Sequence, residues 1–331
     1  MYNAIMLFAF GVLLLIKGGD WFVDGATAIA RRFKIPELLI GATIVSIGTT
    51  LPEVMVSAGG ALSGNGALAY GNAIGSIICN TSLIAAVSIA VAPAAIQRKT
   101  LRTPVLFFAV AAAFYVAISY ITGYFYHWVG FVLLGIFGVY IALNVMSVLR
   151  GSATEELPAV ASEEASEAEE EECMPLWRAI LILVVGAGVI ALGADLVGDN
   201  SQIIAKEIGV PNSVISLTIV ALATSLPELI TAVTALMKGH GALSLGNIIG
   251  ANLFNLVLVS GVSVTLSDFA IPNVAQIGGM NAALVLDIPV MLGVMALMVV
   301  PALIRGKLSR WQGYALLSVY AAYSVVQFTV V

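Results

Sequence analysis

The chain has 331 residues, of which 60% are hydrophobic and only 10% are charged, compared with roughly 45–50% and 25% in ordinary soluble domains. This composition excludes a typical soluble domain and indicates a polytopic membrane protein. The net charge of −5 comes from one segment, because nine of the 19 acidic residues lie between Glu155 and Glu172; without those nine charges the net charge would be +4.

Ten apolar runs reach the length of about 20 residues that a helix needs to cross a bilayer. We therefore predict an all-α membrane protein with ten transmembrane helices. The first and sixth runs are longer than a crossing requires, so these helices should be strongly tilted. The ten spans are expected at residues 3–30, 36–61, 67–92, 103–122, 128–149, 176–205, 211–237, 242–266, 280–303 and 311–330.

Lysine and arginine concentrate in cytoplasmic loops of membrane proteins, and their positions here predict the orientation. Loops on the other side carry only Lys206, and Lys17 lies within the first span. We expect both termini outside and the acidic linker 151–174 in the cytoplasm, between five-helix units at 1–150 and 175–331. The loops after odd-numbered spans carry twelve basic residues: Arg31, Arg32, Lys34, Arg98, Lys99, Arg102, Arg150, Arg178, Lys238, Arg305, Lys307 and Arg310.

The two halves of the chain repeat each other at an offset of 175 residues, without a gap from Asp20 to Asn80. Thr43–Glu53 and Thr218–Glu228 are identical at seven of eleven positions. Because each repeat has an odd number of spans, the second must enter the membrane from the opposite face. Inverted repeats are typical of secondary transporters, whose substrate lies near the midplane between the halves.

Each half places one carboxylate, Glu53 or Glu228, inside an apolar span. An acid at membrane depth is costly and indicates a functional site by default. Pro52 and Pro227 precede these acids, and a proline frees backbone carbonyls one turn earlier in a helix. The freed carbonyls and the nearby hydroxyls are hard oxygen donors, which suit Ca2+ or Na+. The expected oxygen donors on these two segments are the carbonyls from Ser46 to Thr49 and from Ala221 to Thr224 and the side chains of Thr49, Thr50, Glu53, Thr224, Ser225 and Glu228.

The next helix of each half brings a second polar stripe. In the first half, Asn72, Ser76 and Asn80 recur at intervals of four residues, on one face of a helix. The matching stripe of the second half is Asn247, Ala251 and Asn255, with one hydroxyl lost. These helices and the two acid-bearing segments can converge on one oxygen-lined cavity, with Asn80, Ser76 and Asn255 as candidate donors and Asn72 and Asn247 as support between helices.

Two glutamates carry a charge of −2, which balances one Ca2+ or two Na+. Mutually exclusive occupancy by these ions is what an antiporter requires. Empty, ionised sites would also resist a change of conformation, because an unpaired buried charge is costly. This coupling is a hypothesis that ion flux in liposomes would test.

The motifs Thr-Thr-Leu-Pro-Glu at 49–53 and Gly-Asn-Ala-Ile-Gly-Ser at 71–76, with their second copies at 224–228 and 246–251, resemble the two alpha-repeats of the sodium/calcium exchanger family. The resemblance covers both membrane halves and leaves out the linker. It implies that Glu53 and Glu228 are the principal Ca2+ ligands and share in Na+ binding. It further implies electrogenic exchange of several Na+ for one Ca2+, with the first and sixth helices sliding across the remaining bundle.

Four departures from the family pattern modify this expectation. Ala251 stands where a serine is usual, which puts one flanking Na+ site in doubt, and Ile77 replaces an asparagine that survives as Asn252. Asn255 is aspartate in potassium-dependent relatives, so the amide argues against K+ co-transport. Proton-coupled relatives usually have glutamate at the positions of Gly75 and Gly250, so the glycines favour Na+ over H+.

We predict a Na+/Ca2+ antiporter of a prokaryotic plasma membrane that extrudes Ca2+ and has no cofactor. The alternatives are a Ca2+/H+ exchanger and, from another class, a Ca2+-permeable channel. A membrane enzyme is disfavoured because no Ser/His or His/carboxylate constellation lies at membrane depth. The expected partners are inorganic cations and the lipid bilayer, with neither nucleic acid nor an obligatory protein partner.

Overall fold

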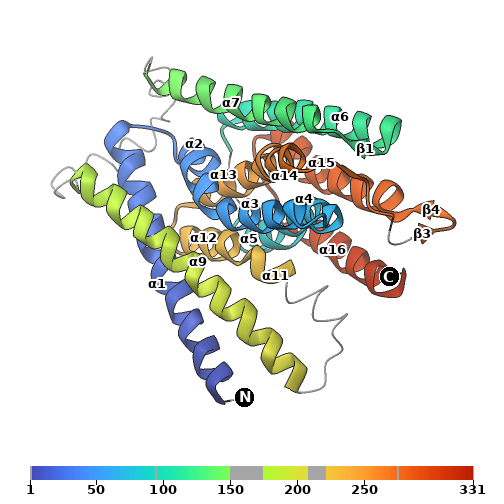
Figure 1. Cartoon of the computed structure of the whole chain (residues 1–331). Helices are drawn as coiled ribbons and strands as arrows, with labels where there is room; N and C mark the ends of the chain where they lie inside the picture. The colour runs from blue at the N-terminus through green and yellow to red at the C-terminus, as the bar shows by residue number, and fades with distance from the viewer. Residues whose placement is uncertain (1, 94–95, 150–173, 208–220, 274–275, 331) are drawn as a thin grey trace.

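The computed structural model describes residues 2–93, 96–149, 174–207, 221–273 and 276–330. Helices dominate it from end to end (Figure 1). The helical elements of the first half are α1 (Tyr2–Phe33), α2 (Glu37–Ile40), η1 (Gly41–Val45), α3 (Ser46–Leu62), α4 (Gly66–Cys79), η2 (Asn80–Ala85), α5 (Ala86–Val91), α6 (Arg98–Thr122) and α7 (His127–Leu149). Those of the second half are α9 (Leu176–Glu207), α11 (Ala221–Thr224), α12 (Leu226–Met237), α13 (Gly241–Phe254), η4 (Asn255–Val259), α14 (Ser260–Leu266), η5 (Ala283–Asp287), α15 (Ile288–Arg305) and α16 (Arg310–Val330).

Eight helical segments of the described chain are long and apolar enough to cross a membrane. They coincide with predicted spans one to six, eight and nine, so the polytopic class and most span positions are confirmed. The predicted span 211–237 is described only from residue 221 onward, as α11 and α12. The predicted span 311–330 forms the 21-residue helix α16, which is not among the eight segments.

The prediction of an all-α chain missed two small antiparallel strand pairs in loops. Strand β1 (Tyr124–Phe125) pairs with β2 (Phe269–Ala270), and β3 (Gln276–Ile277) pairs with β4 (Met280–Asn281). Each strand has two residues, which is too short for hydrophobic alternation to reveal in a sequence. The β1–β2 pair joins loops of the two halves.

Helices α1 and α9 lie side by side and cross one flank of the remaining bundle (Figure 1). Glycines bring their backbones close together: a Cβ on Gly25 would lie 2.7 Å from the Leu183 nitrogen, and one on Gly186 would lie 2.6 Å from the Phe22 nitrogen. Small residues at such contacts are how membrane helices gain packing energy without a hydrophobic driving force. The buried residues of the pair belong to a cluster that also includes Ile40, Val45, Ala235 and Leu243 and is separate from the larger cluster of the bundle.

The turns after α3 and α12 have the same geometry in both halves. Gly64 and Gly239 have φ values of +75° and +82°, a left-handed conformation that glycine adopts without strain. The amides of Asn65 and His240 close the two turns on Gly60 and Ala235 at 2.8 Å each. The local structure therefore repeats at the offset that the sequence predicts.

Four π-helical segments occur in the described chain, and three of them adjoin the helices α3, α4 and α13. Two of them, η2 and η4, begin at Asn80 and Asn255, which are equivalent positions of the repeat. The third, η1, precedes α3 directly, and its Ala42 carbonyl accepts a hydrogen bond of 2.9 Å from the buried Tyr140 hydroxyl. A π-bulge frees one backbone group and frequently occurs at functional sites.

The Tyr140 bond makes a testable contribution to stability. Tyr140→Phe leaves the Ala42 carbonyl with one fewer buried donor, so we expect unfolding free energy to fall by about 1 kcal/mol. Thermal unfolding in detergent measures the change. Tyr314→Phe, at a side chain that is 60% exposed, is the matched control and should unfold like the wild type; equal stability of both variants would contradict this assignment.

Candidate functional site

Glu53 and Glu228 come from α3 and α12 and are both fully buried, with 0% exposure. Their carboxyl groups face each other closely enough to interact electrostatically. None of the four carboxyl oxygens forms a hydrogen bond of normal geometry with the described residues. Buried carboxylates without partners cost several kcal/mol, and a bound cation would offset that cost.

Neutral oxygen donors lie beside the Glu228 carboxyl, and other buried polar atoms occur on neighbouring elements. The Thr49 and Thr50 hydroxyls lie beside the Glu228 carboxyl, although Thr50 makes no well-formed bond. Segment η2, which begins at Asn80, packs against α12, and η4, which begins at Asn255, packs against α3, so each π-helical segment contacts the acid-bearing helix of the other half. Further buried polar atoms without a described hydrogen-bond partner are Ser225 Oγ and both amide atoms of Asn80 and Asn255.

Asn247 crosses from the second half to hold two of the predicted ligand residues of the first. Its side-chain oxygen accepts from the Thr49 hydroxyl at 3.2 Å and lies 3.3 Å from the Ser46 hydroxyl. The Ser46 hydroxyl also reaches the Gly41 carbonyl at 2.7 Å. Asn247 therefore links α13 to α3 beside Thr49 and Ser46.

Its repeat partner Asn72 forms different bonds. The Asn72 amide donates to the Glu53 carbonyl at 3.1 Å and to the Ser57 hydroxyl at 2.8 Å. These bonds tie α4 to α3 at the acid itself, one residue after Pro52. Asn72 thus links α4 to the backbone that carries Glu53.

The two proline motifs differ in backbone structure. Pro52 lies inside the continuous helix α3, whereas the second half breaks at Ser225 and Pro227 is the second residue of α12. The half-buried Thr224 ends α11, and the backbone of Ala221 begins it. Ser76 is buried at 4% exposure in the last turn of α4.

Sequence reasoning overlooked two side chains at this site. The Thr231 hydroxyl, three residues after Glu228, is fully buried without a described partner. The buried Cys79 thiol lies next to Ser225, close enough to both acids to interact with them electrostatically. Neither residue is repeated in the other half, where Val56 and Phe254 stand, so the repeat gave no signal for them.

The donor set is chemically hard. No cluster of three His, Cys, Asp or Glu side chains suited to a metal occurs in the described ranges. Any cation held here is therefore bound largely by hydroxyl, amide and carbonyl oxygens around two carboxylates, a set that suits Ca2+ and Na+.

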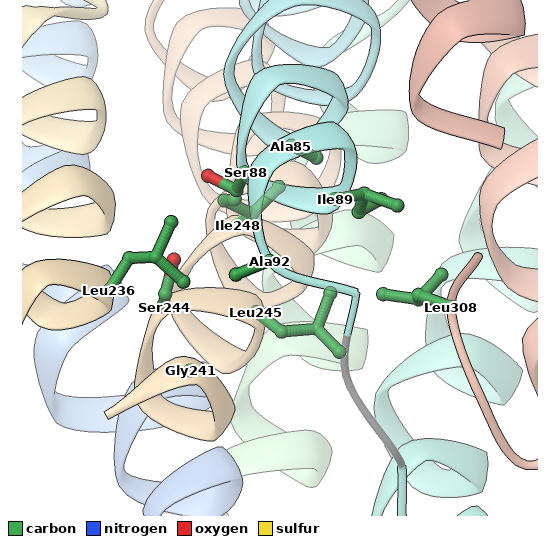
Figure 2. Close-up of a pocket in the computed structure, with 10 residues that line it drawn as sticks. All are labelled: Ala85, Ser88, Ile89, Ala92, Leu236, Gly241, Ser244, Leu245, Ile248 and Leu308. Atoms are coloured by element: carbon green, nitrogen blue, oxygen red, sulfur yellow. The ribbon is translucent and has the colours of Figure 1, made fainter. Parts of the chain in front are cut away.

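A separate pocket lies between the ends of α5, α12 and α13 and the loop before α16 (Figure 2). It encloses roughly 310 Å³, including space open to its surroundings, and contains none of the predicted ligands. Its walls are mainly apolar, with the Ser88 and Ser244 hydroxyls as the polar exceptions. The pocket has no charged group to attract an ion and is distinct from the carboxylate site.

Comparisons with known proteins agree with this architecture. The family described as "Sodium/calcium exchanger protein" matches residues 3–146 and 178–329. The chain is 32% identical to an uncharacterized membrane protein of Methanocaldococcus jannaschii, over 95% of this chain and 94% of the relative. It is 28% identical to the sodium/calcium exchanger MaX1 of Methanosarcina acetivorans, over 98% of each chain.

Solved structures show the same likeness. The structure of the sodium-calcium exchanger NCX_Mj soaked with 2.5 mM Na+ and 0.1 mM Ca2+ superposes on this chain with a TM-score of 0.79 and 28% sequence identity. The superposition covers 98% of this chain and 97% of that one. Together, the matched family model, the relatives and the fold show that this chain belongs to the sodium/calcium exchanger family of membrane cation antiporters.

Proposed function

We propose that this protein exchanges Na+ for Ca2+ by alternating access around Glu53 and Glu228, and that it extrudes Ca2+ from the cytoplasm. The observation that carries the proposal is the pair of fully buried, mutually facing carboxyl groups without well-formed hydrogen bonds. A pair of ionised carboxylates in that position requires a cation to be stable. The printed name of MaX1, a sodium/calcium exchanger, supports the same cargo.

In this proposal, Ca2+ sits between the two carboxylates and takes further oxygens from Thr49, Thr50, Thr224 and Ser225. Ca2+ prefers six to eight oxygen ligands, and the Ser46 and Ala221 carbonyls with Ser76, Asn80 and Asn255 supply enough donors for Na+ on either side. The loss of a hydroxyl at Ala251 weakens the flanking site nearest to it. Asn72 and Asn247 hold these groups in position, and Pro52 and Pro227 free the carbonyls.

Exchange follows from charge. Two carboxylates are neutralised by one Ca2+ or by two Na+, so Ca2+ and Na+ compete for the same site. The empty site leaves two like charges buried side by side, which disfavours the conformational step until an ion binds. Na+ and Ca2+ therefore cross in turn.

The architecture that supports this cycle is ten helices in two inverted five-helix repeats, residues 1–150 and 175–331, joined by a cytoplasmic linker at 151–174. The mirrored turns at Gly64 and Gly239 and the mirrored π-bulges at Asn80 and Asn255 favour the repeat. The distribution of Lys and Arg favours both termini outside a plasma membrane. Inorganic cations and lipid are its partners.

The test of the coupling ion is 45Ca flux into proteoliposomes. We expect a Na+ gradient to drive Ca2+ uptake at least tenfold above the rate with no gradient, and a pH gradient of equal size to drive almost none. Gly75 and Gly250 stand where proton-coupled relatives have glutamate, which is why Na+ is favoured.

The other outcomes of this assay identify the alternatives. Uptake driven by the pH gradient alone would establish a Ca2+/H+ exchanger, in which the two facing carboxyl groups exchange protons for Ca2+. Ca2+ flux without any counter-ion, accompanied by single-channel currents, would establish a channel.

A further inference from the structure

Lys238, the residue after α12, joins α12 to α1 by an ion pair. Its ammonium nitrogen lies 2.7 Å from Asp24 Oδ1 and 3.4 Å from Asp20 Oδ1, and it also donates to the Asp20 carbonyl at 3.2 Å. The lysine side chain is 28% exposed, and the two aspartates are 37% and 49% exposed. Asp24 and Lys238 are 214 residues apart in the sequence, and their ion pair joins the two halves of the chain.

The ion pair connects two bodies of the fold. Helix α12 carries Glu228 in the bundle, while α1 packs on α9 through close glycine contacts. At the interface between them, a Cβ on Gly19 would lie 2.8 Å from both Ile230 and Thr234. The α1–α9 pair therefore rests against the acid-bearing helix, and Lys238 fastens the two where α12 ends.

The other half of the repeat has no lysine at the position equivalent to Lys238. At the 175-residue offset, Asp195 and Asp199 of α9 correspond to Asp20 and Asp24, but Ser63 stands in the place of Lys238. Ser63 and Lys238 occupy matching backbone positions, with φ and ψ of −82° and 5° against −85° and 4°. The difference lies in the side chain and not in the turn.

We propose that Lys238, Asp20 and Asp24 form a one-sided latch that stabilises the present arrangement of the α1–α9 pair relative to the bundle. In an inverted repeat, the opposite arrangement would bring residue 63 to Asp195 and Asp199, where a serine cannot form the ion pair. The latch biases the protein toward one of its two access states. This inference rests on the alternating-access function proposed above.

Distances between spin labels test the latch in the full chain. Labels at Arg32→Cys on α1 and Lys307→Cys after α15, in a Cys173→Ser background, lie on exposed residues outside the latch. We expect Lys238→Met to lower the ratio of the present arrangement to the other about two- to fivefold, the range for a partly exposed ion pair. Ser63→Lys should build the twin latch and shift the ratio in the same direction.

Lys206→Met is the matched control, since it removes a lysine charge from α9 without touching the latch, and it should leave the ratio unchanged. Unchanged ratios for Lys238→Met and Ser63→Lys in a protein that still exchanges Na+ for Ca2+ would overturn the latch alone. If the distance between the two labels has the same single value under all Na+ and Ca2+ conditions, both the latch and the two access states that it assumes would be overturned. Lack of exchange by the labelled parent and the wild type alike would instead refute the proposed function.

Discussion

Glu53→Gln and Glu228→Gln should each reduce Na+-driven Ca2+ exchange at least a hundredfold. Each change removes one of the two charges that balance Ca2+ in a fully buried site. Removing one partner of a buried charge pair costs roughly 3–5 kcal/mol, and each 1.4 kcal/mol is about a tenfold change in binding. Glutamine keeps the size of the side chain, so the loss should appear in 45Ca flux while the protein remains folded.

Asp287→Asn is the control for a half-buried acid outside the site. Asp287 accepts hydrogen bonds from Tyr323 at 3.0 Å and from Gln327 at 2.9 Å, and an asparagine oxygen can accept both. Exchange by this variant should stay within about twofold of the wild type, because the hydrogen bonds between η5 and α16 are kept. Near-normal exchange by either glutamine variant would contradict the assignment of the site.

Gly250→Ala should have the next largest effect, through the contact between α13 and the segment before α3. A Cβ at this position would lie 2.6 Å from the Ala42 Cα and still closer to the Ser46 hydroxyl. Overpacking of this kind costs about 1–3 kcal/mol, and a displacement of about 1 Å in a binding site can cost a hundredfold in activity. We expect exchange to fall at least tenfold and thermal stability to decrease.

The comparison variant is Gly59→Ala in α3, where no described atom lies within 4 Å of the added methyl. Alanine is the better helix former by about 1 kcal/mol, so this variant should exchange normally and unfold no earlier than the wild type. If Gly250→Ala behaves in the same way, the close packing of α13 on η1 does not position the site.

Much of the fold could be predicted because the membrane imposes it. A helix that must cross lipid needs a long apolar run, which is visible in sequence, and the repeat offset located equivalent residues without structure. The burial of Glu53 and Glu228 followed from the same constraint, since a charge in such a run must face the protein interior.

The parts that sequence did not reveal depend on contacts between distant segments. The π-bulge before α3 is held by Tyr140, 98 residues away from the Ala42 carbonyl. Asn72 and Asn247 occupy equivalent sequence positions, yet one binds within its own half and the other across halves. The repeat predicts equivalent positions, but the bonds that each position forms depend on the distant segments packed against it.

The most direct test of the central claim is equilibrium 45Ca binding to the purified protein as Na+ is raised. The account predicts one Ca2+ per chain in the shared site, displaced by Na+ with a Hill slope above one, and loss of that binding in Glu53→Gln and in Glu228→Gln. Ca2+ binding that Na+ does not displace, or that survives with both glutamates replaced, would contradict it.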